Sequence, residues 1–180
     1  MITRQAYLDA QKRAIEALRP SGLSFTDQEL ERIEVVDFGL SDVNREGAQI
    51  LTLVQTERLS VKVLILFPQQ TEPEHCHPPI GEDPGKEETI RVITGTLYLY
   101  LPGDATLKQC QIPEGKEQFY TSRNELIMRK NCQVTLKPGT KHWFQAGAEG
   151  AVLFSFSTAV CDLVDQFSDP NVVRVTKIDQ

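Results

Sequence analysis

The first stretch of the chain carries the apolar spacing of an amphipathic helix between Thr3 and Leu18. Its apolar stripe consists of Tyr7, Ala10, Ile15 and Leu18. The Thr3 hydroxyl can cap the first turn, and the run Pro20-Ser21-Gly22 stops the helix. The pattern therefore predicts one helix of about four turns at the start of the chain.

A second, shorter helix is predicted a few residues further on. It should begin at Thr26 or Asp27 and run to about Arg32. Thr26 and Glu29 have the spacing of a capping box, in which each side chain accepts a hydrogen bond from a backbone N–H of the other. We expect residues 1–33 to pack as helices against the remainder of the chain.

From Glu34 onward the pattern changes to short β-strands separated by turns. Alternation is clear in Val61-Lys62-Val63-Leu64-Ile65-Leu66. The predicted strands are Glu34–Phe38, Ala48–Gln55, Leu59–Phe67, Thr89–Ile93, Thr96–Leu101, Glu125–Arg129, Gln133–Leu136, His142–Ala146, Ala151–Ser157 and Val172–Lys177. Turns are expected at Gly95, Pro102-Gly103-Asp104, Pro113-Glu114-Gly115, Pro138-Gly139 and Gly147-Ala148-Glu149-Gly150. Many short, closely spaced strands favour a mainly β, antiparallel sandwich or barrel.

Composition and charge narrow the class of protein. A chain of 180 residues is expected to form one domain with a substantial core. Hydrophobic residues at 40% and charged residues at 24% are ordinary for a soluble globular protein. The net charge of -6, without any basic run, argues against nucleic acid as a partner. No apolar leader or membrane-length apolar stretch is visible, so a cytoplasmic protein that does not bind a membrane is expected.

The three histidines of the chain give its most specific chemical signal. His75 and His77 sit in Glu-Pro-Glu-His-Cys-His-Pro-Pro, and His142 sits in Lys-Pro-Gly-Thr-Lys-His-Trp-Phe. Alternate residues of a strand share a face, so a His-x-His on a strand directs both imidazoles into one space. A Gly-Lys-Glu-Glu run between the pair and His142 can add a carboxylate. Three imidazoles and one carboxylate, with positions left open, are typical of a catalytic divalent-metal site.

The cysteines do not form a competing metal site. Cys76, Cys110, Cys132 and Cys161 lie far apart without any Cys-x-x-Cys pair. Cys76 lies between two histidines, but on a strand it points to the opposite face. We therefore expect four free thiols, as in a reducing compartment.

The histidine pattern resembles the cupin superfamily. The first cupin motif runs from a His pair through a Glu to a Gly, and here Glu88 is followed by six residues and then Gly95. The second motif is Pro-x-Gly and then His, of which Pro138-Gly139-Thr140-Lys141-His142 is a close variant. Cys132 replaces the Gly that usually opens this motif, which concerns a turn and not the ligands. The resemblance implies a jelly-roll barrel over residues 34–180.

Two glutamates compete for the fourth ligand position. Glu82 has the short cupin spacing after the His pair, but it lies in the irregular run Gly81-Glu82-Asp83-Pro84-Gly85. Glu88 instead shares a strand face with Ile90 and Val92, two expected core residues. A ligand needs a rigid support to hold its geometry, which favours Glu88. The predicted metal ligands are His75, His77, Glu88 and His142.

Longer blocks of the chain resemble the D-lyxose ketol-isomerase family of cupins. These blocks are Glu74-His75-Cys76-His77-Pro78-Pro79, Gly85-Lys86-Glu87-Glu88-Thr89, Gly95-Thr96-Leu97-Tyr98-Leu99-Tyr100, His142-Trp143-Phe144-Gln145-Ala146-Gly147 and a tail with Ser157-Thr158-Ala159, Asp162, Asp165, Phe167, Asp169-Pro170 and Arg174. The resemblance implies a Mn²⁺-dependent isomerase that interconverts D-lyxose and D-xylulose, with D-mannose and D-fructose as secondary substrates. It also implies a homodimer.

Moving a carbonyl between C1 and C2 of a sugar fits such a metal site. A divalent ion with two open positions can hold two neighbouring sugar oxygens and stabilise the developing enediolate. A positioned acid/base must also carry a proton between the carbons, unless a hydride shifts directly. The candidates are Lys86 and Asp162, followed by Glu87 and, less favoured, Lys141. Trp143 either walls the pocket against a sugar face or belongs to the core or an interface.

Three other interpretations use the same residues. A cupin dioxygenase would hold Fe²⁺ in the same cage, because one ligand set serves several metals. A non-catalytic cupin would hold a sugar or small acid, although degraded ligands would then be expected. A structural zinc site is disfavoured, because such sites are closed and rich in cysteine.

Overall fold

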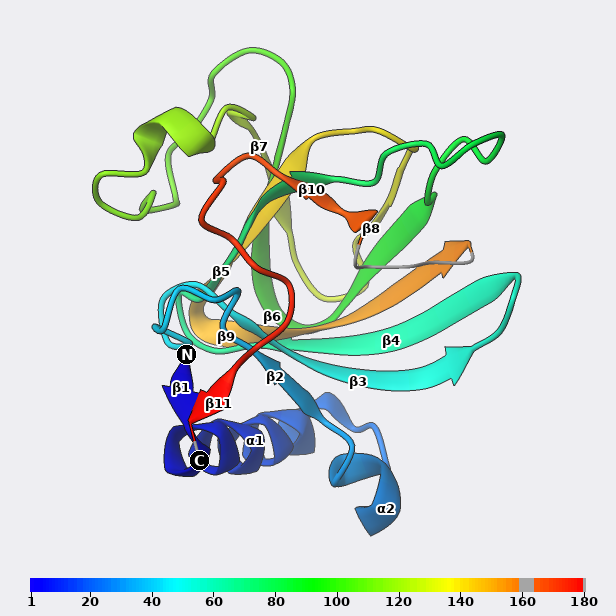
Figure 1. The fold of residues 1–180 in the computed structure, drawn as a ribbon, viewed down its shortest axis with the longest axis vertical. Helices are drawn as coiled ribbons and strands as arrows, with labels where there is room; N and C mark the ends of the chain where they lie inside the picture. The colour runs from blue at the N-terminus through cyan, green and yellow to red at the C-terminus, as the bar shows by residue number, and fades with distance from the viewer. Residues whose placement is uncertain (159–163, 180) are drawn as a thin grey trace.

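Two long strands, β6 (Glu88–Leu101) and β9 (His142–Thr158), pair antiparallel along most of their length and form the centre of the fold. The computed structural model describes residues 1–158 and 164–179. The other strands are β1 (Ile2–Thr3), β2 (Glu34–Val36), β3 (Ala48–Gln55), β4 (Leu59–Leu66), β5 (Thr71–Cys76), β7 (Asn124–Met128), β8 (Gln133–Leu136), β10 (Gln166–Phe167) and β11 (Ile178–Asp179). The main sheet runs in the order β10-β5-β9-β4-β3-β2, with β7 and β8 paired to β6 (Figure 1). The mainly β, antiparallel fold predicted from the sequence is confirmed.

The predicted breaks at Gly95 and at residues 147–150 are wrong, because β6 and β9 bend there and continue. The pairing register shifts between Gly95 and Leu97, while pairing with β9 persists on both sides. Gly95 has a φ of +77°, and an added Cβ would lie 2.0 Å from the carbonyl oxygen of Gly150. Only glycine permits this close approach of two bent strands. The first half of β6 therefore pairs with β8 and its second half with β7.

The predicted strand Val172–Lys177 is also wrong. Val173 donates its N–H to Phe38 and Asp37 donates to the Thr176 hydroxyl, but no ladder forms. Exposure still alternates along the segment, with Val173 48% and Val175 53% exposed. This alternation produces a strand-like pattern in a segment that lies along the edge of the barrel without pairing. Only Ile178–Asp179 pairs, in parallel with β1.

The helix α1 (Arg4–Leu18) covers the outer face of the barrel sheet (Figure 1). Thr3 caps it as predicted, since its hydroxyl accepts from the Ala6 N–H at 3.1 Å. Its buried residues Ala10, Ala14 and Leu18 pack with outward-facing strand residues such as Val63 and Ile65. The shorter helix α2 (Asp27–Leu30) begins with the predicted capping box of Thr26 and Glu29. Neither this helix nor any other among the described residues is long and apolar enough to cross a bilayer.

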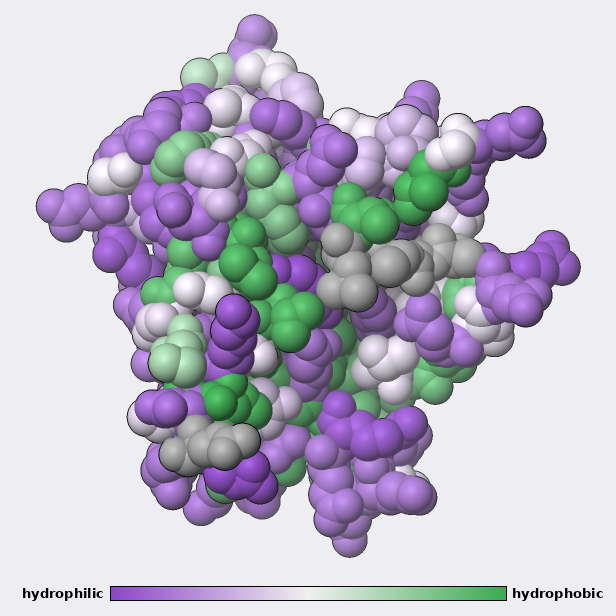
Figure 2. Space-filling model, in the orientation of Figure 1, coloured by the Kyte–Doolittle hydropathy of each residue, from purple (hydrophilic) through white to green (hydrophobic). Residues whose placement is uncertain are grey.

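The interior of the barrel is apolar at one end and polar at the other. Leu64, Leu66 and other buried side chains fill the apolar end, together with Ile90, Val92, Leu97, Leu99, Phe144, Ala146 and Leu153. Lys62 is a charged residue on the same inward strand face as Leu64 and Leu66, and only 7% of Lys62 is exposed. On the outside, Figure 2 shows a mostly hydrophilic face whose apolar side chains gather across its middle. The polar end of the interior is where the histidines lie.

Trp143 belongs to a separate aromatic cluster and does not line that interior. Its ring stacks on Tyr100 with centroids 4.0 Å apart and meets Tyr120 edge-on at 4.6 Å. The indole N–H donates to the Ser122 carbonyl at 2.7 Å, and the side chain is fully buried. The core interpretation of Trp143 is therefore correct. The cluster packs the segment that connects β6 to β7 against the barrel.

Glu74 also holds the segment that connects β6 to β7, through hydrogen bonds. Its carboxylate accepts from the Ser122 N–H at 2.6 Å, the Thr121 hydroxyl at 2.8 Å and the Ser168 hydroxyl at 2.6 Å. Burial alone would raise the pKa of Glu74, but the hydrogen bonds from Ser168, Ser122 and Thr121 hold it below the ordinary value. Glu74 is therefore ionised in the folded protein at neutral pH.

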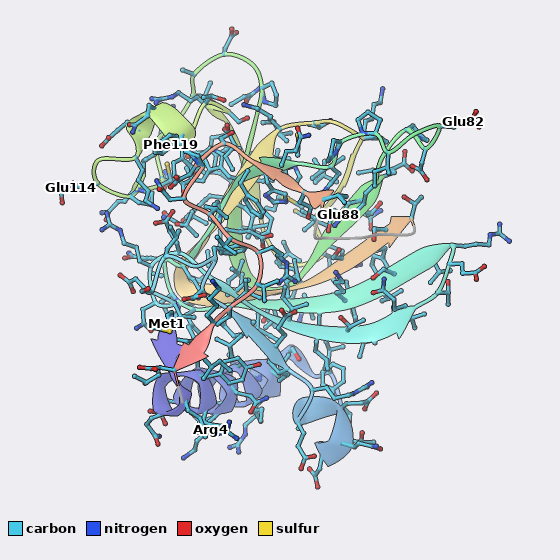
Figure 3. The ribbon with its side chains drawn as sticks, in the orientation of Figure 1. Met1, Arg4, Glu82, Glu88, Glu114 and Phe119 are labelled. Carbon is cyan, nitrogen blue, oxygen red and sulfur yellow. The ribbon has the colours of Figure 1, made fainter. Side chains whose placement is uncertain are left out.

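We predict that Glu74→Gln lowers the free energy of unfolding by about 1–3 kcal/mol at pH 7, because an amide group would face donors with its own N–H₂. The deficit should shrink as the pH falls through the carboxyl pKa, since protonation removes the same charge from the wild type. Urea unfolding at pH 7 and in acid measures both effects. Glu114→Gln is the matched control, since Glu114 points into solvent (Figure 3). Equal stability of the two variants would contradict this prediction.

Candidate metal centre

The three histidines converge at the polar end of the barrel. His75 lies on β5, His77 follows that strand, and His142 begins β9, where it pairs directly with His75. The His75 ring centroid lies 4.3 Å from that of His142 and 5.1 Å from that of His77. One ring nitrogen of each lies within 4.8 Å of the other two, and all three residues are buried. Cys76 is not part of this group, in keeping with its place on the opposite strand face.

Each imidazole is held by a hydrogen bond at Nδ1. His75 Nδ1 lies 2.8 Å from the Pro73 carbonyl, and His142 Nδ1 lies 2.9 Å from the Thr140 carbonyl. His77 Nδ1 lies 2.7 Å from Asp165 Oδ1. These acceptors require a proton on Nδ1, so the lone pair resides on Nε2. Three Nε2 atoms thus face one another across a buried space.

The groups around the Nε2 atoms fit a cation. Glu88 Oε2 lies 3.1 Å from His77 Nε2, and the Ser155 hydroxyl donates to the other oxygen of Glu88. His142 Nε2 is buried and has no hydrogen-bond partner among the described residues. Lone pairs and a carboxylate gathered in a dry space repel one another unless a proton or a metal ion lies between them. Three imidazole nitrogens and one carboxylate suit a divalent ion.

The protonation equilibria of the histidines follow from this crowding. Burial lowers the pKa of His142 to about 4, and burial together with the neighbouring histidines holds the pKa of His75 well below its usual range. Burial also opposes the charged form of His77, but its bonds to Asp165 and Glu88 raise its pKa overall. A neutral imidazole is the form that binds a metal. The site therefore holds two of its histidines in that form and pairs the third with carboxylates.

The two glutamates that the sequence analysis weighed, with Glu88 preferred over Glu82, lie in different surroundings. Glu88 begins β6 inside the barrel and is only 6% exposed, whereas Glu82 lies in an exposed loop (Figure 3). Burial would raise the pKa of Glu88, but Lys86 and His77 hold it well below its usual range. Glu88 is therefore an anion facing the histidines, and Glu82 is in solvent.

A cavity opens beside the histidines. It is lined by apolar and charged side chains from several strands and from the C-terminal segment, namely Phe38, Ile50, Lys62, Leu64, Glu72, His75, Lys86, Glu88, Phe144, Ser155, Asp165, Phe167 and Arg174. Lys86 Nζ lies 3.9 Å from Glu88 Oε2 with its side chain 10% exposed, so this predicted acid/base candidate lines the cavity. Asp162, the other candidate, lies outside the described residues. Glu87 is exposed, and the half-exposed Lys141 lies near Glu74.

Glu72 is a residue of this cavity that sequence reasoning missed. On a regular strand, Glu72 and His75 would face opposite sides, because they are three residues apart. The β5–β9 register shifts between them, and Glu72 Oε1 consequently lies 3.9 Å from His75 Nε2. Pro73 inside the strand was the available signal, since proline in a strand marks an edge or a bulge. Burial, followed by the charge of Glu88, raises the pKa of Glu72 to about 7.

Comparison with known proteins defines the family. No protein-family model matches the chain. A D-lyxose ketol-isomerase of Cohnella laeviribosi is 45% identical over 172 residues, which cover 95% of this chain and 94% of that protein. A D-lyxose/D-mannose isomerase of Thermosediminibacter oceani is 43% identical over 180 residues and 99% of both chains. Such identity over nearly the whole length identifies common descent.

Solved structures agree on the fold. An L-ribose isomerase of Acinetobacter superimposes with a TM-score of 0.81 at 14% identity, covering 99% of this chain and 98% of that one. An L-ribose isomerase of Cellulomonas parahominis gives 0.80 at 15% identity, with coverage of 99% and 98%. The barrel is thus of the cupin type, as the sequence predicted. The relatives at 43% and 45% identity support a sugar isomerase over the dioxygenase and the binding module, and the chain belongs to the D-lyxose ketol-isomerase family.

Proposed function

We propose that this sugar isomerase interconverts D-lyxose and D-xylulose, and D-mannose and D-fructose less efficiently, in a metal-dependent reaction. The observation that carries the proposal is the convergence of three buried Nε2 atoms and the Glu88 carboxylate on one side of a polar cavity. The printed names of relatives at 43% and 45% identity support the choice of sugar.

His75, His77, Glu88 and His142 would hold the metal, for which the family resemblance favours Mn²⁺. A divalent ion held there would supply the positive charge that stabilises the developing enediolate oxygen. Ser155 keeps the Glu88 carboxylate in place by donating a hydrogen bond to its second oxygen. Phe144 and Phe167 line the cavity and exclude water from the reacting carbons.

Two charged side chains of the cavity are placed to move the proton. Lys86 lies beside Glu88, and Glu72 lies beside His75. Glu72 Oε2 is buried and has no hydrogen-bond partner among the described residues, so it can accept a hydrogen bond from a sugar hydroxyl. In the proposed route, one of these groups removes the proton from C2 of the aldose and a proton is delivered to C1, while the hydroxyl proton of O2 passes to O1, which gives the ketose.

We predict one divalent ion per chain in protein reconstituted with Mn²⁺. His77→Ala and Glu88→Gln should each lose most of the bound metal, because each removes one ligand from a set of four. Elemental analysis after desalting measures the content. Glu82→Gln is the matched control and should keep the wild-type content, since Glu82 is exposed on its loop. If Glu82→Gln lost the metal while Glu88→Gln kept it, the assignment of the carboxylate ligand would be reversed.

We predict that the Mn²⁺-loaded protein forms D-xylulose from D-lyxose, and D-fructose more slowly from D-mannose. Removal of the metal with a chelator should abolish turnover, and Mn²⁺ should restore it, because the proposed route relies on the metal to stabilise the enediolate oxyanion. A colorimetric ketose assay over a panel of pentoses and hexoses measures both effects. Metal-loaded protein that converts neither sugar would show the proposed reaction to be wrong.

We predict that Lys86→Met and Glu72→Gln each lower kcat while the metal stays bound. Substitution of the residue that carries the proton should lower kcat by about 10²–10⁴-fold. Lys141→Met is the matched lysine control, since Lys141 lies outside the cavity lining. Turnover in deuterated water should place deuterium in the product. Product free of deuterium would instead indicate a hydride shift between the carbons, and wild-type kcat in both variants would remove these residues from the mechanism.

A further inference from the structure

The segment Val164–Arg174, named here the C-terminal strap, runs across the barrel from β10 (Figure 1). Its residues Asp165, Phe167 and Arg174 line the cavity beside the histidines. Its residues Gln166 and Phe167 pair as β10 with Cys76 and His75 of β5. The Phe167 ring lies 5.5 Å from the His75 ring, measured between centroids. Asp165, just before this short strand, reaches His77 Nδ1 at 2.7 Å. The strap therefore contacts the two histidines of the His-x-His pair.

The support of His77 differs from that of the other two histidines. His75 and His142 each bond a backbone carbonyl two residues earlier in the chain, so their own local backbone fixes their rings. His77 bonds a side chain 88 residues later in the sequence. The orientation of its ring consequently depends on the strap being in place.

We propose that Asp165 is a positioning residue for His77 and that it links docking of the strap to binding of the metal. The carboxylate accepts a hydrogen bond from the Nδ1–H of His77. This bond fixes the tautomer and directs the Nε2 lone pair toward Glu88 and the other histidines. Because linkage is reciprocal, the bound metal stabilises the docked strap as much as the docked strap strengthens metal binding. This inference rests on the proposed metal site and is independent of the sugar.

The strap also makes contacts away from His77, so Asp165 can be substituted without loss of every contact that holds the strap. The Ser168 N–H donates to the Glu74 carbonyl at 2.9 Å, and Lys116 Nζ lies 3.1 Å from Asp169 Oδ2. At the far end, Arg174 bonds Glu34 at 2.9 Å. The contacts of Ser168 and Arg174 hold the strap when either Asp165 or Asp169 is changed. Asp169 offers a matched substitution on the same strap, since it is a buried aspartate that bonds Lys116 and Asn171 and lines no part of the cavity.

The test measures Co²⁺ binding to wild type, Asp165→Ala, Asp165→Asn and Asp169→Ala, by competition with a chelating dye and by the visible absorption of bound Co²⁺. Asp165→Ala should bind Co²⁺ about 10–100-fold more weakly, with an altered spectrum. Asp165→Asn should recover part of the affinity, because its amide oxygen still accepts from Nδ1. Asp169→Ala should keep the wild-type spectrum and lose less than about threefold in affinity. Thermal unfolding without metal should show that each variant is folded.

Hydrogen exchange of the strap amides gives the reciprocal readout. Co²⁺ should slow exchange over residues 164–174 in the wild type and have little effect in Asp165→Ala. Wild-type affinity and spectrum in Asp165→Ala would overturn the proposal, as would an equal loss in Asp169→Ala, which would assign the effect to strap docking in general. A wild type that binds no Co²⁺ would contradict the metal site itself. Sugar turnover does not enter the test, so the two failures are distinguishable.

Discussion

The orientation of three imidazole rings is the constraint on which the site depends. Each ring bonds an acceptor through Nδ1, and each Nε2 lone pair is thereby directed into the same buried space. Without a cation, lone pairs and the Glu88 carboxylate share a region from which water is largely excluded, and His142 Nε2 keeps no partner among the described residues. The electrostatic repulsion within this group of lone pairs and carboxylate requires a positive charge to offset it. The chemistry proposed for the enzyme follows from that charge.

The barrel provides the rigid frame for this arrangement. The close approach of Gly95 to Gly150 lets β6 and β9 bend and pair on both sides of the bend. Apolar side chains then fill one end of the interior, and Glu88, Ser155, Lys62 and the histidines occupy the other. His75, Glu88 and His142 lie on paired strands, where a ligand is held more accurately than on a loop. The exposed loop position of Glu82 illustrates the alternative that the fold does not use.

The sequence predicted what depends on local pattern and spacing. It gave the helix after Thr3, the capping box at Thr26, most strands and the gathering of His75, His77 and His142. It missed what depends on a shift of register or on distant partners. A bulge in β5 brings Glu72 to the side of His75. The glycines at the bends of β6 and β9 predicted turns, although both strands continue through the bends. The contact of Asp165 with His77 joins residues 88 positions apart, and no local signal reveals it.

We propose that one catalytic metal ion lies among His75, His77, Glu88 and His142. Anomalous diffraction from a crystal of the Mn²⁺-loaded protein, collected above and below the manganese absorption edge, would locate this ion. We expect one strong manganese peak per chain at about 2–2.3 Å from the three Nε2 atoms and from a Glu88 oxygen. A peak at any other group of residues, or the absence of a peak at this site in protein that turns over sugar, would contradict it.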